Sequence, residues 1–344
     1  MVSPSLLQIR KAKRGLYETF DFRGESADGR YAFLLRHTMF RPLWRGAGVV
    51  EVALMLFDRQ GQRSQCVVER EEMSELHLRQ LRKLTDWEGF AFSFASGSYV
   101  EISRHGLRGK LHTPGGAASW TLDLLRKDDV LQPFPADFCY GLPWPGHKIQ
   151  VRDCALRFQG RLQAGNLRLD GEWSGSNLHY WGDGYPREFA AAQCGRFADD
   201  SQAFFYGFSS QLSLGRLRTP YLGMASLRLR GRWYHFNELG GIFRHRLESL
   251  DNYRWRIVFL NPEYGLKVEV DGGNPRLRPW LAWHADHPLG GRSVIKATPF
   301  AQGCLTLYRR RNSEQVATLH SDSFELKTLL PENVPEATGF LAEV

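Results

Sequence analysis

The chain has 344 residues, of which 13% are aromatic, with 34 glycines and a net charge of +8. This length suffices for one large domain or two ordinary ones, and the scarcity of long helical patterns favours an all-β fold. The basic residues are spread along the chain rather than gathered in a stripe, which argues against nucleic-acid binding.

The five cysteines are widely spaced and form no Cys-x-x-Cys pair. This pattern favours a reducing compartment and offers no zinc-binding spacing. The first residues lack the apolar core of a signal peptide, and no apolar run is long enough to cross a membrane. We therefore expect a soluble, cytoplasmic protein without an integral membrane segment, with weak peripheral contact to an anionic membrane left open.

The first part of the chain predicts a flexible N-terminus at 1–14 and an N-terminal β-domain at 15–127. The best helix candidate is 70–86, where apolar residues recur at a partly helical spacing. The other segments alternate short apolar and aromatic runs with turn residues, which indicates an antiparallel meander. The strands are predicted at 16–22, 30–40, 49–57, 89–94, 99–102, 107–111 and 119–125.

Residues 128–148 contain several prolines, which cannot donate to a strand ladder. We expect this segment to connect two β-domains. The second domain is expected at 149–325, and a C-terminal tail at 326–344. Its strands are predicted at 149–158, 165–173, 203–208, 221–229, 231–236, 253–260, 264–270 and 303–308.

The stretch 176–197 gathers His, Asp, Glu, Tyr, Trp and Gln side chains about Gly182, Gly184 and Pro186. Glycine permits unusual backbone angles and proline stops a ladder, so this stretch is predicted to be two strands that meet at a tight corner. Corners of this kind at barrel rims can aim side chains into a cavity. The alternative is a structural corner whose polar groups only satisfy buried backbone.

The run from Trp181 to Cys194 resembles the central motif of the tocopherol cyclase-like proteins, a Trp-Gly-x-Gly-aromatic-Pro run followed by a Gln-Cys pair. His179-Tyr-Trp-Gly182 is also similar to the His-Asn-Trp-Gly motif of the related lipocalin-like group that includes the carotenoid 1,2-hydratases. Less specific matches extend this resemblance over most of residues 15–310. The sequence departs from the family's pattern at Tyr180, at the alanines 190–192 and at Gly195.

The resemblance implies two consecutive lipocalin-like (calycin) antiparallel β-barrel domains that enclose an apolar cavity. The family's activities are ring closure or double-bond hydration on isoprenoid chains or aromatic polyenes, and they need no metal and no nucleotide. We therefore expect a hydrophobic small-molecule substrate and no cofactor. Alanines at 190–192 replace the large rings of the family, and we expect them to widen or reshape the cavity.

Ring closure and alkene hydration both require a proton on carbon and a cation that is kept from bulk water. A carboxylic acid in an apolar pocket has a raised pKa and can hold that proton, while aromatic faces stabilise the cation. The catalytic candidates are therefore His179, Asp183 and Glu188. The alternatives are a satisfied buried histidine, an Asx-type turn at Asp183 and a solvated rim charge at Glu188.

The other candidates are predicted to hold the substrate. Strand alternation places Trp181 on the face of His179 and Tyr180 on the opposite face. Arg36 and His37 are adjacent, so at most one of them faces a given interior. The substrate-binding candidates are Arg36, His37, Tyr180, Trp181, Tyr185, Gln193 and Trp233.

We expect a metal-free, cofactor-independent cyclase, hydratase or isomerase that acts by proton transfer on an apolar isoprenoid, polyene or other natural-product intermediate. The alternative from another class is a non-catalytic carrier of a hydrophobic small molecule, because fold alone does not decide between the two. A buried acid that faces the cavity favours catalysis, and an apolar pocket without one favours carriage. A filled interior would favour a purely structural role.

Overall fold

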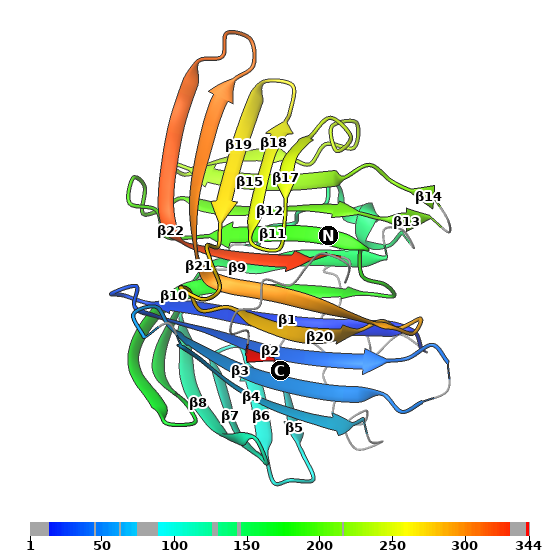
Figure 1. Ribbon diagram of the computed structural model, residues 1–344, viewed down its shortest axis with the longest axis vertical. Coiled ribbons are helices and arrows are strands. Elements are labelled where there is room, and N and C mark those ends of the chain that lie inside the picture. Colours follow the sequence, from blue (N-terminus) through cyan, green and yellow to red (C-terminus); the bar gives the residue numbers. More distant parts are fainter. Residues whose placement is uncertain are drawn as a thin grey trace.

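The computed structural model describes residues 14–44, 46–61, 63–73, 89–125, 130–142, 146–214, 217–330 and 342–343. Within these ranges the chain is almost entirely β-strand, with a single short 3₁₀ helix at Asp137–Tyr140. Two curved antiparallel sheets lie one above the other along the long axis of the molecule (Figure 1). The predicted all-β fold of two consecutive barrel-like units is confirmed.

The first sheet comes from the N-terminal half of the chain. Its described residues form ten strands in the order β4-β3-β2-β1-β10-β9-β8-β7-β6-β5. The strands are β1 (Leu16–Ser26), β2 (Tyr31–Arg41), β3 (Val49–Asp58), β4 (Arg63–Glu72), β5 (Gly89–Ser93), β6 (Tyr99–Ser103), β7 (Gly106–Thr113), β8 (Gly116–Leu125), β9 (His147–Ala164) and β10 (Leu167–Gly182).

The second sheet follows the order β16-β15-β12-β11-β22-β21-β19-β18-β17 in the described part of the chain, with β20 on β21 and β23 on β20. A short ladder joins β13 (Ser213–Leu214) to β14 (Leu217–Arg218). The strands of the sheet are β11 (Glu188–Cys194), β12 (Phe204–Gln211), β15 (Leu222–Leu229), β16 (Arg232–Phe236), β17 (Arg246–Leu250), β18 (Arg254–Leu260), β19 (Tyr264–Asp271), β20 (Leu281–Asp286), β21 (Arg292–Arg309), β22 (Gln315–Leu329) and β23 (Ala342–Glu343).

Strands at the centre of the molecule are buried on both faces. In β1 every residue except the two at its ends is buried, whereas β8 at the outside alternates buried and exposed or half-buried positions. One face of β1 lines the inside of the first sheet and the other faces the second sheet. Even the charged residues of β1 are therefore shielded from solvent. Glu18, Asp21 and Arg23 are all buried in this way.

The apolar residues of the described chain gather in distinct clusters. One fills the inside of the first sheet around Trp120, and another fills the inside of the second sheet around Trp255. Two more lie between the sheets, one that includes Tyr180 and one that includes Trp283. The interface between the sheets is therefore a core of its own, which is where buried polar groups from both sheets meet.

The predicted connector at 128–148 does not divide the two sheets. β9 and β10 come after it in the sequence, yet both belong to the first sheet, where β10 pairs with β1. Leu131 pairs with Val151 of β9, and Phe134 packs in the cluster between the sheets. The chain passes from one sheet to the other at 183–187. We propose this crossing as the domain boundary, in place of the segment 128–148.

Two further predictions concern the segment after β3 and the chain ends. The helix predicted at 70–86 begins in residues that belong to β4, and its remainder from 74 lies outside the described residues. The predicted flexible segment 1–14 lies almost wholly outside them as well. The predicted tail boundary at 325 falls within β22, which continues to Leu329. Among the described residues, no helix is long and apolar enough to cross a membrane.

Candidate functional site

The predicted motif occupies the end of β10, the crossing to the second sheet and all of β11. His179 lies opposite Phe20 of β1 and stacks on that ring, inside the first sheet. Tyr180 belongs to the cluster between the sheets. The motif therefore contributes to two sites on opposite faces of one strand, as alternation predicts for His179 and Tyr180.

Inside the first sheet, His179 forms a buried pair with Glu18 of β1. Its Nε2 lies 2.8 Å from Glu18 Oε1, with the two side chains 2% and 0% exposed. The imidazole is stacked against Phe20, with ring centroids 4.3 Å apart, and against Trp181 at 4.5 Å. Burial lowers the pKa of His179, and the hydrogen bond and charge of Glu18 oppose that shift.

This pair can store and release one proton. With the proton on His179 the pair is ionic, and with the proton on Glu18 the pair is neutral. In both forms the proton lies between Nε2 of His179 and Oε1 of Glu18. The stacked rings of Phe20 and Trp181 supply π faces that favour a nearby cation. The arrangement fits acid chemistry on an apolar substrate.

Two more polar side chains of this sheet are buried in its interior. His37 is surrounded by the rings of Phe22, Phe90 and Trp120, and burial lowers its pKa to about 3. Asn177 of β10 is fully buried, and neither polar atom of its amide has a hydrogen-bond partner within the described residues. Buried polar atoms are rarely left unpaired, so Asn177 points to a polar group that the described residues do not supply.

Between the sheets, a network of charges connects β1, β2 and β22. Arg36 Nε donates to Asp21 Oδ1 at 2.9 Å, and Lys327 Nζ donates to Asp21 Oδ2 at 2.7 Å. Tyr180 donates to the same carboxylate at 3.1 Å. Burial alone would raise the pKa of Asp21, but the charges of Arg36 and Lys327 hold it well below its usual range. The guanidinium of Arg36 also lies 4.0 Å from the ring centroid of Trp283.

Beside this network, three residues form a second polar and aromatic group. Tyr185, in the crossing between the sheets, stacks on Tyr17 with ring centroids 4.1 Å apart. The hydroxyl of Tyr17 is hydrogen-bonded to Nδ1 of His147, the first residue of β9. Burial raises the pKa of Tyr17 well above its usual value and lowers that of His147 to about 3. Both groups are therefore neutral near pH 7.

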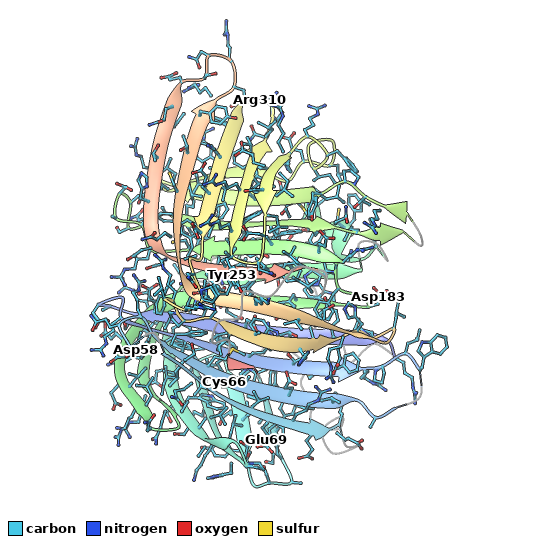
Figure 2. The ribbon with its side chains drawn as sticks, viewed as in Figure 1. Asp58, Cys66, Glu69, Asp183, Tyr253 and Arg310 are labelled. Atoms are coloured by element: carbon cyan, nitrogen blue, oxygen red, sulfur yellow. The ribbon has the colours of Figure 1, made fainter. Side chains whose placement is uncertain are left out.

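The remaining predicted residues do not join His179. Asp183 is exposed at the turn after β10 and lies at the edge of the molecule (Figure 2). Glu188 is half-buried on β11 and accepts a hydrogen bond from Tyr221. Gln193 accepts from Ser176 at 2.8 Å and donates to Glu325 between the sheets. Trp233 packs on His235 at the edge strand β16.

The predicted catalytic trio is thus not assembled at one point. Asp183 is exposed, as is usual for a turn residue, and does not lie in an apolar site. Glu188 belongs to the other sheet and already has a partner in Tyr221. Of the three candidates, His179 alone is fully buried and paired with a carboxylate, and that carboxylate favours a proton on the imidazole.

Several pockets lie near these groups. A small one of about 30 Å³ lies between the sheets beside Arg36, Tyr180 and Tyr185. A polar one of about 390 Å³ reaches Gln193. An apolar one of about 110 Å³ is lined by His147 and by residues of β12, β15 and the segment 134–142. Ala190 and Ala192 are buried in the core of the second sheet, while Ala191 packs toward the interface.

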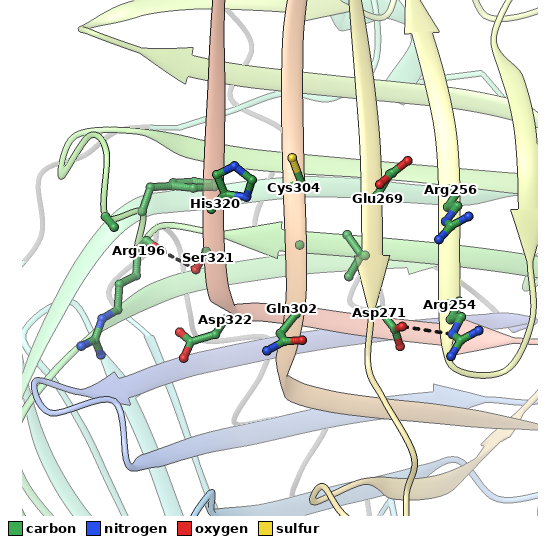
Figure 3. Close-up of a pocket in the computed structure, with 14 residues that line it drawn as sticks. Arg196, Arg254, Arg256, Glu269, Asp271, Gln302, Cys304, His320, Ser321 and Asp322 are labelled. Carbon is green, nitrogen blue, oxygen red and sulfur yellow. Dashed lines mark hydrogen bonds and ion pairs between the residues drawn. The ribbon is translucent and has the colours of Figure 1, made fainter.

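A hollow of about 820 Å³ lies on the outer face of the second sheet, across β18, β19, β21 and β22 (Figure 3). Charged residues of both signs line it, and Arg254 is already paired with Asp271 at 3.1 Å. No candidate residue from the sequence lines it. We therefore place the candidate site in the first sheet and at the interface rather than in this open hollow.

The partners that sequence reasoning missed come mostly from β1. Glu18 and Asp21 lie on opposite faces of that strand, and Lys327 reaches Asp21 from the far end of the chain. In the sequence, these residues belong to a predicted strand with charged side chains at 18, 21, 23 and 25. That pattern is equally typical of a solvent-exposed edge strand. Among the described residues, no group of three or more His, Cys, Asp or Glu side chains is placed to hold a metal ion.

No protein family matches the sequence, and no curated protein matches it either. The fold does match solved structures. CghA crystallised with Sch210972 has a TM-score of 0.55 at 10% identity, covering 92% of this chain and 88% of CghA. The chain shares the fold of CghA.

A second structure of CghA agrees with that likeness. CghA alone gives a TM-score of 0.57 at 10% identity over the same shares of the two chains. Kievitone hydratase from Nectria haematococca gives 0.49 at 9% identity, covering 96% of this chain and 94% of that one. The likeness to the two CghA structures shows a shared fold.

Proposed function

We propose that the protein is a cyclase, hydratase or isomerase that transfers a proton to an apolar isoprenoid, polyene or other natural-product intermediate without a cofactor. The observation that carries this proposal is the buried pair of His179 and Glu18, stacked between Phe20 and Trp181. A proton donor among apolar and aromatic side chains is what alkene protonation needs.

In the proposed reaction, His179 delivers its proton to one carbon of a double bond, which leaves a cation on the other carbon. The rings of Phe20 and Trp181 stabilise that cation. In a cyclisation or isomerisation, the cation then loses a proton, and the pair of His179 and Glu18 takes it back. In a hydration, a water molecule adds to the cation and its proton returns to the pair, so the net change is addition of water.

Two observations support a small-molecule substrate. The unpartnered amide of Asn177 lies in the same interior as His179 and offers a place for water or a polar substrate group. The solved structure of CghA contains Sch210972, so a protein of this fold holds a small molecule. The substrate-binding roles of Arg36, His37, Tyr180, Trp181, Tyr185, Gln193 and Trp233 remain part of the proposal, as do a cytoplasmic location and peripheral membrane contact.

The second candidate is a non-catalytic carrier of a hydrophobic molecule. The observation that favours it is the apolar pocket of about 110 Å³, whose lining includes neither an aspartate nor a glutamate. A carrier needs such a pocket and has no use for a buried proton donor. The two candidate functions therefore differ in whether replacement of His179 abolishes conversion of the bound molecule.

The test begins with native mass spectrometry of the freshly purified protein and analysis of its organic extract. The bound molecule is then incubated with wild-type protein and with His179→Ala. The proposal expects wild-type protein to convert the molecule and His179→Ala to leave it unchanged, with the strand signal in circular dichroism preserved. His105→Ala, at an exposed histidine, is the matched control. Binding without conversion by wild-type protein would favour the carrier.

A further inference from the structure

The apolar pocket of about 110 Å³ lies between the segment 134–142, the strands β12 and β15, and the loop that follows β16. Phe208, Met224 and Ile242 are among the side chains that line it. Leu142 and Leu239, which also line it, are 45% and 56% exposed. The pocket therefore has an apolar interior and an apolar rim in contact with solvent.

Large exposed apolar side chains that surround a concave apolar site are typical of ligand-binding surfaces. Phe138 and Phe243, next to the pocket in sequence, are each 60% exposed as well. A volume of about 110 Å³ exceeds that of a single water molecule several-fold, and an apolar void of this size has little to hold water. An apolar chain is the occupant that its lining fits.

Among the described residues of the lining, His147 is the one imidazole, and none of them carries an ammonium, guanidinium or carboxyl group. The hydroxyl of the fully buried Tyr17 has Nδ1 of His147 as its acceptor. If Nδ1 carried a hydrogen instead, the buried Tyr17 hydroxyl would have no acceptor among the described residues, which would cost about 1–3 kcal/mol. Tyr17 therefore donates and Nδ1 accepts.

The tautomer of His147 follows from this hydrogen bond. Burial lowers the pKa of His147 to about 3, so the ring is neutral and carries one hydrogen. Because Nδ1 accepts from Tyr17, that hydrogen lies on Nε2 and points away from Tyr17. Within the described residues, Nε2 has no hydrogen-bond partner. The described lining of the pocket thus combines an apolar wall with two uncharged donors, the Nε2–H of His147 and the hydroxyl of Ser210.

We propose that this pocket binds the apolar end of a neutral ligand whose carbonyl or hydroxyl oxygen accepts a hydrogen bond from His147 Nε2. Carboxylates are disfavoured, because an apolar lining without a cation leaves an anion unpaired. This inference deepens the proposed function by naming the ligand class, and it rests on the apolar substrate of that function. It does not depend on His179. Ligand binding in this pocket and proton transfer by His179 can therefore be tested, and can fail, independently.

The experiment measures binding of the neutral fluorescent probe N-phenyl-1-naphthylamine and its displacement by 2-nonanone and by nonanoate at pH 7.5. The proposal expects the ketone to displace the probe at a concentration at least tenfold below that of the carboxylate. Leu239→Arg, at the exposed rim, should raise the Kd of the probe at least tenfold. Leu289→Arg is the matched control, since Leu289 is 60% exposed and does not line the pocket.

His147→Phe separates the hydrogen bond from the apolar contact. The proposal expects this variant to bind the probe and to lose most of the preference for the ketone. If it fails to fold, two-dimensional nitrogen NMR of wild-type histidine rings decides the point, because ketone should shift the Nε2–H signal of His147. Equal displacement by ketone and carboxylate, no NMR shift, or unchanged probe binding in Leu239→Arg would overturn the proposal. If His179→Ala stops conversion of the substrate while Leu239→Arg binds the probe as wild-type protein does, the proposal for this pocket is refuted. The proposed function is then retained.

Discussion

At the residue scale, the pair of His179 and Glu18 shows what the sequence could and could not predict. His179 was a candidate because it lies in the motif, and its burial agrees with the strand pattern around it. Glu18 lies 161 positions earlier in the chain, and nothing local marks it as a partner. Pairing between β1 and β10 brings the two together, and such pairing is a property of the tertiary fold rather than of either segment.

Replacing Glu18 by Gln should lower the pKa of His179 further. The charge and hydrogen bond of Glu18 raise that pKa against the effect of burial, and glutamine removes the charge. A histidine NMR titration of wild-type protein and Glu18→Gln measures the shift. The exposed His105 provides an internal control in both samples. An unchanged or higher pKa of His179 in the variant would mean that the two side chains are not coupled in solution.

The buried network at the interface yields a prediction on stability. Asp21→Asn leaves the buried Arg36 without its carboxylate partner, while Lys327 keeps Glu325 at 3.2 Å, and breaking a buried ion pair typically costs about 3–5 kcal/mol. We expect a loss of that size in the free energy of unfolding, measured with urea. Asp170→Asn, at an exposed pair with Arg161, should cost much less, because solvent screens that pair. Equal losses in the two variants would contradict the network.

At the element scale, most strands could be predicted from alternation and turn residues, but their partners could not. The proline-rich segment before β9 and β10 predicts that these strands belong to the second domain, and the sheet order places them in the first sheet. Leu131 and Phe134 of that segment pack in the cluster between the sheets, which a free linker would not do. The motif was correctly read as a corner between strands, and the structure adds that this corner joins the two sheets.

The two glycines of that corner, Gly182 and Gly184, differ in whether a larger side chain would fit. A Cβ on Gly182 would lie 1.8 Å from the carbonyl oxygen of Gly146, whereas a Cβ on Gly184 would meet nothing within 4 Å. We therefore expect Gly182→Ala to lower the free energy of unfolding by about 1–3 kcal/mol, the usual cost of forcing atoms into a packed site. Gly184→Ala should be neutral or slightly stabilising. Urea unfolding of both variants checks this, and a tolerated Gly182→Ala would argue against close approach of β9 and β10 at this point.

At the scale of the whole molecule, composition and the central motif were enough to predict an all-β protein of two barrel-like units. They could not predict that the interface between the sheets would be a core with its own buried charges. Charged residues in β1 and β2 look like surface residues until both faces of these strands are known to be covered. That arrangement also determines how the molecule responds to acid.

Stability should fall as the pH drops from neutrality. Burial lowers the pKa of His37 to about 3, below the value of about 6.5 for an unfolded histidine. The unfolded state therefore binds protons first, so stability present above pH 6.5 is lost as the pH falls towards 3. Between pH 7.5 and pH 5 the loss due to His37 reaches about 2 kcal/mol.

His37→Phe should remove that part of the pH dependence. Urea unfolding at pH 7.5 and pH 5 gives the change in free energy for each variant. The change should be smaller in His37→Phe than in wild-type protein, and the same as wild type in His105→Phe. Equal changes in all three proteins would mean that His37 does not stay neutral in the folded state.

The central claim is that the protein moves a proton onto carbon through His179. The most direct measurement is to incubate the molecule extracted from the purified protein with wild-type protein in D₂O and to record the mass of every species that forms. We predict a product that carries carbon-bound deuterium from wild-type protein and none from His179→Ala. A molecule that returns unchanged from wild-type protein, or the same deuterated product from both proteins, would contradict the account.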